Sequence, residues 1–254
     1  MFPFSDEIDE MKILLESSDS TRPEHIFDTL DPDGQQQNLD LQEEILQVDD
    51  SELPTETEQS KSLDFIDPDY AKFKPLPIKD DSIMKAEASQ LSFEQRIVFD
   101  KIIKFCKKEV IAKKCGDFES TPPLILAHGG AGVGKTYLIK TLSSWIQKIS
   151  QREGLHPLQP HVLLLAPTGV AANNIGGTTL HSGLDFKIGK KYIPLSSESQ
   201  QTMTKLLENV KVLIIDELSM ISADLLYDVN KRMQSIMTSE DPFGGVAVVL
   251  LGDI

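Results

Sequence analysis

The sequence of 254 residues is long enough for one α/β domain of ordinary size, or for a smaller domain preceded by a tail. Its net charge of −15 is unevenly spread, since residues 1–90 hold 24 acidic and 7 basic residues while residues 91–254 hold 16 acidic and 18 basic residues. The acidity therefore belongs to the N-terminal part, and the near-neutral remainder does not exclude a nucleic-acid partner.

The chain opens without the pattern of a signal peptide, and its longest strongly apolar run, residues 246–251, is too short to span a bilayer. The two cysteines, Cys106 and Cys115, lack the spacing of a zinc site and imply no disulfide. We therefore expect an intracellular protein, and a nuclear one if its source is eukaryotic.

Residues 1–88 are rich in Asp, Glu, Ser, Gln and Pro and hold too few apolar residues for a core, which predicts an acidic, mostly disordered leader. Residues 68–77 carry three prolines, which suggests an extended strap on the surface of the domain. Two short apolar stripes at helical spacing could fold onto a protein partner, but a solvated tail with accidental periodicity is the favoured interpretation. They comprise Ile8, Met11 and Leu15, and Leu41, Ile45 and Val48.

We expect an ordered domain from residue 89 onwards. Ser92 and Gln95 form a predicted capping box at the start of a long helix with its buried face at Ile97, Ile102, Phe105, Cys106 and Val110. Apolar runs predict buried strands, and shorter periodic segments predict helices at about residues 202–209 and 223–237. The strands fall at residues 124–127, 162–166, 212–215 and 246–251. This alternation predicts an α/β fold with a parallel sheet covered by helices on both faces.

A phosphate-binding loop follows the first of these strands. Its glycines let the backbone wrap an anion at a helix N-terminus, and the strand before it and the helix after it are the context that the pattern requires. Lys135 is predicted to reach the β- and γ-phosphates, and the Thr136 hydroxyl to bind Mg²⁺. The loop comprises Gly129, Gly130, Ala131, Gly132, Val133, Gly134, Lys135 and Thr136.

The other strands also end on reactive or turn-forming residues. Asp216 follows the third strand directly, where a second Mg²⁺-organising carboxylate is expected, and the adjacent Glu217 is placed to orient and deprotonate an attacking water. The second strand ends on Pro167-Thr168-Gly169 and the fourth on Gly252-Asp253. Carboxyl ends of parallel strands form one edge, so these residues are predicted to share a site.

Four segments together resemble the Pif family of superfamily-1 DNA helicases, relatives of RecD. They are GGAGVGKT, LAPTGVAANNIGGTTLHS, IIDELSMIS and a strand that closes on Gly-Asp, and the resemblance extends from Leu91 to Ile254. It implies that residues 89–254 form the first RecA-like motor domain of such a helicase, a P-loop fold that uses ATP and Mg²⁺.

The resemblance also implies residue roles. Gln95 matches the adenine-reading glutamine of the family, while its place in the capping box offers a structural role that is compatible with the first. A group of small or polar residues is implied to hold the backbone of single-stranded DNA without reading bases. The group comprises Pro167, Thr168, Gly169, Ala171, Thr179, His181 and Ser182. For His181 taken alone, packing or a loop hydrogen bond is the favoured interpretation, and only its place in the motif puts a contact with nucleic acid on an equal footing.

The function implied by the resemblance is ATP-dependent 5′-to-3′ translocation on single-stranded DNA and unwinding at duplex junctions, with roles in DNA repair, recombination and telomere maintenance. The chain stops at Gly252-Asp253-Ile254, before the family's γ-phosphate-sensing glutamine, its second RecA-like domain and that domain's arginine. We therefore expect a fragment of a longer protein with poor activity by itself.

Two other functions remain open from the residues. A P-loop phosphotransferase would act on a small molecule and would not respond to DNA, but the segment from Pro167 to Ser182 argues against it. A module that binds nucleotide or DNA without turnover would recruit partners through the acidic leader, but the intact Lys135, Asp216 and Glu217 argue against it.

Overall fold

The computed structural model describes residues 12–14, 73, 79–115, 121–152, 159–187 and 192–253, with the backbone alone for 12–14, 111–115 and 152. All of these belong to one compact unit, formed by Met1–Ser18 and Pro68–Ile254, while Asp19–Asp67 form a second unit outside the described residues. The disorder expected of the leader and its two apolar stripes therefore falls almost wholly outside the described residues.

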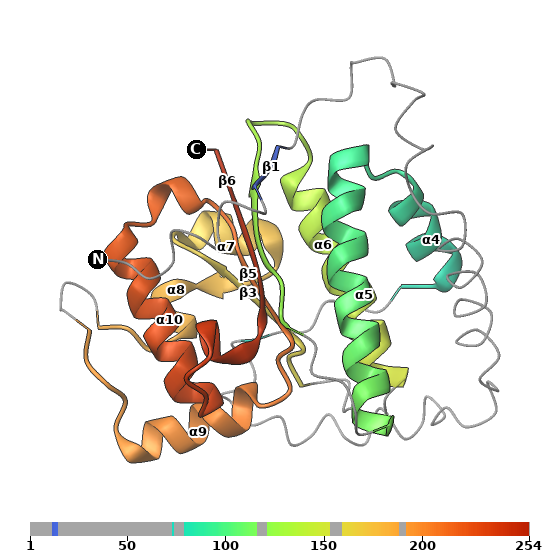
Figure 1. The fold of residues 1–254 in the computed structure, drawn as a ribbon. Coiled ribbons are helices and arrows are strands. Elements are labelled where there is room, and N and C mark those ends of the chain that lie inside the picture. The colour runs from blue at the N-terminus through green and yellow to red at the C-terminus, as the bar shows by residue number, and fades with distance from the viewer. Residues whose placement is uncertain are drawn as a thin grey trace, which may run out of the picture. The chain divides into compact units, whose positions relative to one another are not determined.

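The described residues form a parallel sheet of six strands in the order β1-β2-β6-β5-β3-β4 (Figure 1). The four strands expected from apolar runs are confirmed to within about one residue, whereas the two edge strands β1 and β4 were not predicted. The bounds are β1 Lys12–Leu14, β2 Leu124–His128, β3 Val162–Ala166, β4 Thr178–Thr179, β5 Val212–Ile215 and β6 Ala247–Gly252.

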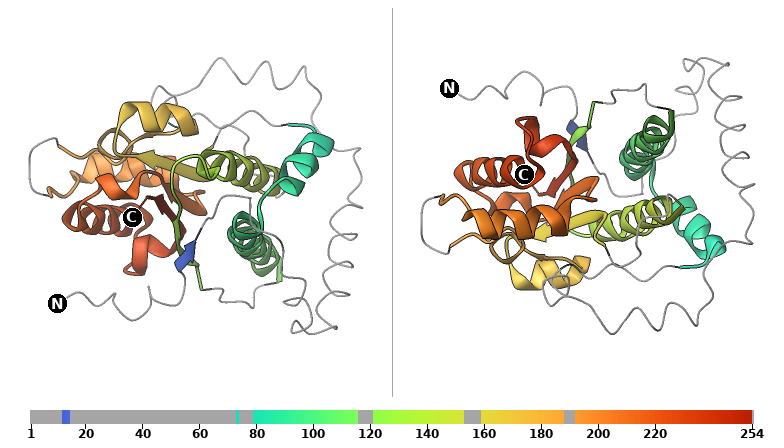
Figure 2. Two further views of the ribbon diagram at one scale, coloured as in Figure 1. Left: turned by 90° about the horizontal axis from the view of Figure 1, so that it is seen from above. Right: turned by 90° about the horizontal axis from the view of Figure 1, so that it is seen from below.

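Helices lie on both sides of the central strands, with α5 and α6 on one side and α9 and α10 on the other (Figures 1 and 2). The predicted parallel sheet with helices on both faces is confirmed. The α-helices are α4 Asp81–Ser89, α5 Phe93–Cys115, α6 Lys135–Arg152, α7 Gly169–Ile175, α8 Leu180–Gly183, α9 Ser197–Leu207 and α10 Ala223–Met237. Two 3₁₀ turns are η6 Leu218–Met220 and η7 Pro242–Gly245. Within the described residues, no helix is long and apolar enough to cross a membrane.

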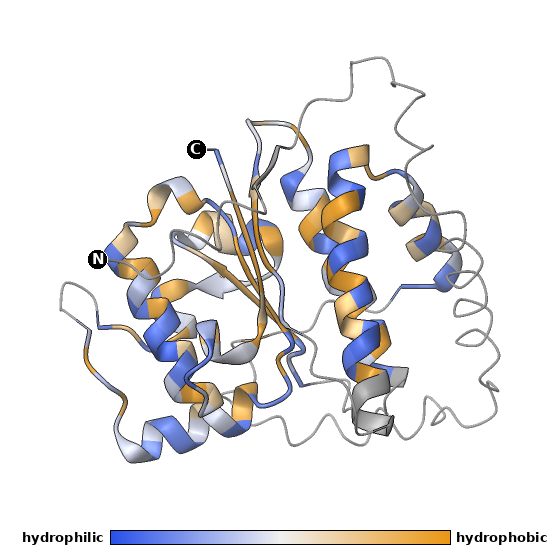
Figure 3. Ribbon diagram, in the orientation of Figure 1, coloured by the Kyte–Doolittle hydropathy of each residue, from blue (hydrophilic) through white to orange (hydrophobic). Residues whose placement is uncertain are grey.

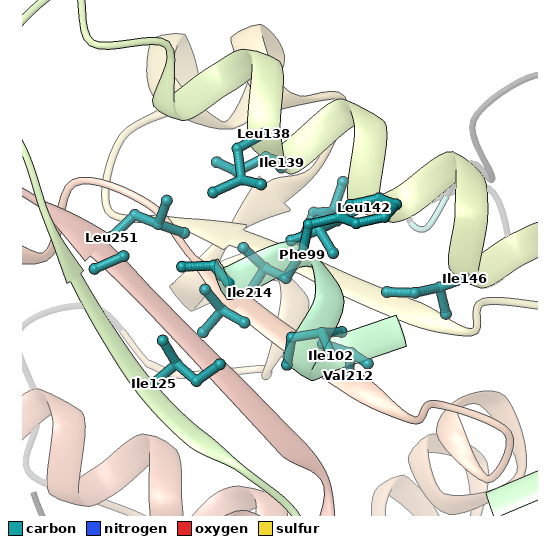
Figure 4. Close-up of a cluster of buried hydrophobic side chains, with 14 of the residues drawn as sticks. Phe99, Ile102, Ile125, Leu138, Ile139, Leu142, Ile146, Val212, Ile214 and Leu251 are labelled. Atoms are coloured by element: carbon teal, nitrogen blue, oxygen red, sulfur yellow. The ribbon is translucent and has the colours of Figure 1, made fainter. Parts of the chain in front are cut away.

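Each face of the sheet has its own hydrophobic core. Helices α5, α6 and α7 cover Ile125, Val212 and Ile214 on one face (Figure 4), and α8, α9 and α10 cover Leu213 and Ile215 on the other. The central strands are accordingly hydrophobic along their whole length, while the long helices alternate between polar and apolar surfaces (Figure 3). Burial on both faces explains why the sequence shows continuous apolar runs and no two-residue alternation.

Helix α4 lies before the predicted capping box and spans the domain boundary expected at residue 88. Two side chains of α6 hold this helix in place. The Tyr137 hydroxyl donates to the carbonyl oxygen of Glu87 over 2.8 Å, and the indole nitrogen of Trp145 donates to that of Met84 over 3.3 Å. Only Met84 and Ala88 of α4 are buried. A helix with so short an apolar stripe gives little sequence signal.

The buried face of α5 also differs from the expectation at its first turn. Ile97 is 41% exposed, and Val98 and Phe99 are buried in its place, whereas Ile102 and Cys106 are buried as predicted. Phe73, within the segment expected to form a surface strap, packs into the core beneath α8, α9 and α10.

Candidate functional site

The phosphate-binding loop lies between the end of β2 and the start of α6, as the sequence predicts. Gly132 and Gly134 have φ values of 82° and 84°, in the left-handed region where side chains are disfavoured. The first residue of the loop is anchored to the neighbouring strand, because the Gly129 amide donates to the carbonyl oxygen of Gly252 over 3.1 Å. The loop is therefore fixed at one end by β6 and at the other by α6.

Lys135 folds back over this loop. Its ammonium group donates to the carbonyl oxygens of Gly129 and Gly130 over 2.6 and 2.9 Å. The cation therefore lies over the concave backbone at the N-terminus of α6, which is where an anionic phosphate would be attracted both by the charge and by the free amides of the helix. The lysine can exchange these carbonyl contacts for phosphate oxygens without leaving the loop.

Gln95 is almost fully buried and joins α5 to the same loop. Its Oε1 accepts from the backbone nitrogen of Ser92 over 3.0 Å, and the Ser92 hydroxyl accepts from the Gln95 backbone nitrogen over 3.3 Å, so the predicted capping box is confirmed. Its Nε2 donates to the carbonyl oxygen of Val133 over 2.7 Å. A Cβ atom on Gly134 would lie only 2.6 Å from this Nε2, so a side chain at this position would displace the Gln95 amide.

Asp216 and Glu217 follow β5 and are held in place by backbone hydrogen bonds. The Asp216 amide donates to the carbonyl oxygen of Leu165 on β3 over 3.0 Å, and its Oδ1 accepts from the Glu217 amide over 2.9 Å. Glu217 itself has φ 55° and ψ 47°. A non-glycine residue in this left-handed conformation costs about 1–3 kcal/mol and is typical of functional sites.

Burial raises the pKa of Asp216 above its usual value, and the nearby charge of Glu217 raises it further, while the Glu217 amide and the positive charge of Lys135 lower it. Asp216 and Lys135 are therefore close enough to interact, although they come from different strands' ends. A buried carboxylate that carries a desolvation cost would be stabilised by a divalent cation.

The residues present fit a magnesium ion of the kind that nucleotides bring. Mg²⁺ prefers one or two protein oxygens together with phosphate oxygens and waters, and the Thr136 hydroxyl and the Asp216 carboxylate could supply the protein share. Among the described residues there is no cluster of three or more His, Cys, Asp or Glu side chains that could hold a metal. A dedicated all-protein metal cage is thus not part of the described site.

The segment after β3 forms a capped turn. Thr168 is the N-cap of α7, and its hydroxyl oxygen accepts from the Ala171 amide over 3.2 Å. Gly169 and Val170 are exposed, Val170 by 75%, whereas the Ala171 side chain packs into the core. Pro167, Thr168 and Gly169 are therefore accessible to a ligand, but Ala171 is not presented through its side chain and its amide already serves the cap.

The segment after β4 repeats this arrangement beside it. β4 pairs in parallel with β3 so that Thr179 lies opposite Ala166, and Thr179 is the N-cap of α8, its hydroxyl oxygen accepting from the Ser182 amide over 3.2 Å. His181 is half-buried and Ser182 is exposed. The structure therefore brings the two predicted nucleic-acid segments together on neighbouring strands.

Gly252 is a structural member of the site whose role the sequence analysis missed. Besides accepting from Gly129, it passes so close to η6 that a Cβ atom there would lie 2.9 Å from the Leu218 backbone nitrogen. The end of β6 therefore touches both the phosphate loop and the turn after Glu217. A lone glycine after an apolar run gives no sequence signal for such a contact.

These features define a class. A strand, a glycine-rich loop with its lysine, a helix and an acidic strand end two strands away form a P-loop nucleotide-binding domain with a parallel α/β sheet. The model of the PIF1-like helicase family matches residues 90–254, which is well over half of the sequence. The chain therefore belongs to the PIF1-like helicase family, and the resemblance drawn from its motifs is confirmed.

The chain is also similar to individual proteins. The chain is 36% identical over 128 residues to the ATP-dependent DNA helicase RRM3 of Saccharomyces cerevisiae, covering 49% of this chain and 17% of that protein. It is 31% identical over 184 residues to human ATP-dependent DNA helicase PIF1, covering 70% and 24%. A Bacteroides Pif1 helicase crystallised with ADP-AlF3 and ssDNA is 27% identical, with a TM-score of 0.46 over 64% of this chain and 32% of that one. The chain thus spans about a sixth to a quarter of these two curated relatives.

Proposed function

We propose that this chain is the nucleotide-binding motor domain of a Pif-type ATP-dependent DNA helicase, which couples ATP hydrolysis to movement along single-stranded DNA. The observation that carries the proposal is the shared edge of the sheet: β2 ends on the phosphate loop, β5 on Asp216-Glu217, and β3 and β4 on the capped turns at Thr168 and Thr179. Nucleotide chemistry and a polymer-binding surface therefore meet along one row of strand ends.

In the proposed reaction Lys135 and the loop amides hold the β- and γ-phosphates and offset the negative charge that develops on them. A magnesium ion bound through Thr136 and Asp216 would supply further charge neutralisation between the phosphates. Glu217 accepts the proton of the water that attacks the γ-phosphorus. Its strained backbone, held by the hydrogen bond from its amide to Asp216, fixes the direction of its Cα–Cβ bond.

Single-stranded DNA would lie over the turns after β3 and β4. Each capping threonine uses an oxygen lone pair to accept from a helix amide, so its hydroxyl hydrogen stays free to donate to a phosphate oxygen. Gly169 and Ser182 are exposed next to these hydroxyls, and His181 adds a ring that can contact the strand. Contacts of this kind hold the DNA backbone and do not select bases, as a motor on any sequence requires.

We extend the proposal to what the resemblance implies for the complete helicase. It includes 5′-to-3′ translocation, action at duplex junctions, roles in repair, recombination and telomere maintenance, an intracellular and, in a eukaryote, nuclear location, and a protein partner for the acidic leader. It also includes a second RecA-like domain that would contribute an arginine to the ATP site.

The test is ATP hydrolysis by the protein, with and without single-stranded DNA. Glu217→Gln should lower the DNA-stimulated rate by about 10²-fold or more while nucleotide binding persists. Glu240→Gln, an exposed glutamate on the same chain, is the matched control and should leave the rate unchanged. Turnover that survives Glu217→Gln contradicts the assigned base. Phosphate transfer to a soluble acceptor without stimulation by DNA would instead favour the phosphotransferase.

A further inference from the structure

Arg232 on α10 is the charged side chain that the site described above does not use. It is 2% exposed, and its Nη2 donates to the carbonyl oxygen of Ile193 over 2.8 Å. Its Nε and Nη1 have no hydrogen-bond partner in the described part of the chain. Burying a guanidinium with most of its donors unpaired is costly, so a compensating interaction or function is expected.

Two aromatic rings supply that interaction. The Arg232 guanidinium carbon lies 5.0 Å from the centroid of Phe186 and 5.3 Å from that of Tyr192. Burial and Asp224 raise the pKa of Asp228, one turn earlier on α10, while Arg232 lowers it. The arginine is therefore held mainly by stacking and by one carbonyl, a role that its planar group suits and a lysine does not.

The two rings come from opposite ends of the connection between α8 and α9. Phe186 follows α8 directly, and Tyr192 and Ile193 lead toward α9. Through these contacts Arg232 attaches both ends of this connection to α10. Helix α10 itself packs on the sheet through Val229, Met233 and Ile236. Phe186 is thus attached, through Arg232 and α10, to the core of the domain.

Phe186 in turn contacts His181. The two rings meet edge to face with centroids 6.2 Å apart and planes at 77°, and the Phe186 amide donates to the His181 carbonyl oxygen over 2.9 Å. An edge-to-face contact favours a defined orientation of both rings. A continuous set of contacts therefore runs from Arg232 through Phe186 to the half-buried histidine beside the capped turn of α8.

We propose that Arg232 is a positioning residue for the single-stranded DNA site: by clamping Phe186 and the chain at Tyr192-Ile193 onto α10, it fixes the ring of His181 where the strand passes. The inference rests on the proposed function. Arg232 itself does not touch DNA, because it is buried. Its effect reaches the strand through Phe186 and His181 and leaves the nucleotide loop alone.

The experiment measures binding of labelled oligothymidine by fluorescence anisotropy and binding of a fluorescent ADP analogue, at one salt concentration. Arg232→Met keeps the length of the side chain but removes the planar cation and the bond to Ile193. We expect about tenfold weaker DNA binding and nucleotide affinity within twofold of the parent. Lys231→Met removes an equal charge from the adjacent, exposed position and should change DNA binding by less than twofold.

A double-mutant cycle separates positioning from general destabilisation. Phe186→Leu should also weaken DNA binding by about tenfold, and the double variant should be no worse than either single variant, because both break the same chain of contacts. The ring proton signals of His181 in NMR, assigned with His181→Gln, should shift in Arg232→Met while those of the buried His161 stay in place. If Arg232→Met fails to fold, Arg232→Lys and Phe186→Leu carry the same measurements, with a partial loss expected for the lysine.

Three outcomes would overturn the inference. They are normal DNA affinity in Arg232→Met, equal losses of DNA and nucleotide affinity in that variant, and a hundredfold loss of DNA affinity in the double variant. A parent chain that binds nucleotide but no oligothymidine would overturn the proposed function on which it rests. A parent that binds oligothymidine, with the selective loss and the shifted His181 signals described above, supports both.

Discussion

The side-chain amide of Gln95 connects the first turn of α5 to the phosphate-binding loop by donating to the carbonyl oxygen of Val133 over 2.7 Å. The same amide group closes the capping box through its oxygen. The shape of the loop is therefore coupled to the start of α5, whether or not the second hydrogen of Nε2 also reads an adenine. Gln95 can thus serve nucleotide binding by supporting the loop as well as by contacting the base.

Gln95→Glu tests the loop-supporting contact. A glutamate keeps the capping box, since Glu and Gln both suit that position, but it places an acceptor against the Val133 carbonyl. We expect nucleotide affinity to fall about tenfold, from the lost hydrogen bond and the facing oxygens, together with a lower melting temperature because the carboxylate is buried. Ser92→Ala is the matched control, because it should lower the melting temperature and leave nucleotide affinity nearly unchanged. Equal effects of both variants on nucleotide binding would contradict the prediction.

Asp216→Asn should stabilise the nucleotide-free protein at neutral pH. Burial raises the pKa of Asp216, so the folded chain holds this proton more tightly than the unfolded chain. Stability from this group is greatest at low pH and is lost as the pH rises from the ordinary aspartate pKa of 3.8 toward the raised pKa of the folded chain, so at pH 7.5 the ionised carboxylate is a net cost. The asparagine can still accept from the Glu217 amide.

We expect Asp216→Asn to raise the melting temperature by about 2–4 °C at pH 7.5 without magnesium, which corresponds to about 1 kcal/mol. The gain should shrink as the pH is lowered toward 4, and magnesium-dependent ATP binding should be lost. Glu208→Gln, at an exposed position, should show none of these effects. A destabilised Asp216→Asn variant would show that the carboxylate makes contacts that offset its burial.

The central strands and the phosphate loop could be predicted because their signals are local. Residues 162–166 and 212–215 are continuous apolar runs, and the loop has a fixed pattern of residues. β1 and β4 are only three and two residues long, and they are strands because β2 and β3 offer them a partner. Pairing of this kind depends on tertiary contacts that a short window of sequence does not contain.

The sequence predicted which residues belong to the site better than it predicted the contacts that these residues make. The family resemblance placed Thr168 and Thr179 in one site, but it did not show that both are helix caps or that Ala171 faces the core. The burial of Arg232 could not be foreseen, because arginine is usually exposed and its aromatic partners lie about 40 residues away in the sequence.

Thr168→Ala separates the two uses of the capping hydroxyl. Loss of the acceptor for the Ala171 amide should lower stability by about 1 kcal/mol. Loss of the donor to phosphate should weaken oligothymidine binding by about fivefold, which corresponds to one hydrogen bond. Thr168→Ser keeps both functions and should stay close to the parent in melting temperature and in fluorescence anisotropy. A serine variant as weak as the alanine variant would show that the methyl group, and not the hydroxyl, is what matters.

Gly252→Ala should disturb the contact between β6 and the turn after Glu217. The added Cβ would lie 2.9 Å from the Leu218 nitrogen and 3.0 Å from the Leu218 Cβ, and backbone atoms cannot rotate away as a flexible side chain can. We expect a loss of about 1–3 kcal/mol in the free energy of unfolding, measured in urea. In the folded fraction the ATPase rate should fall, because the end of β6 positions both the Gly129 amide and the turn that follows Glu217.

Gly130→Ala is the matched control. It has open space around the new Cβ and should leave the unfolding free energy unchanged. A Gly252→Ala variant as stable and as active as the parent would contradict this prediction. It would show that η6 can shift without moving Glu217, and that the end of β6 does not hold the catalytic carboxylate in place.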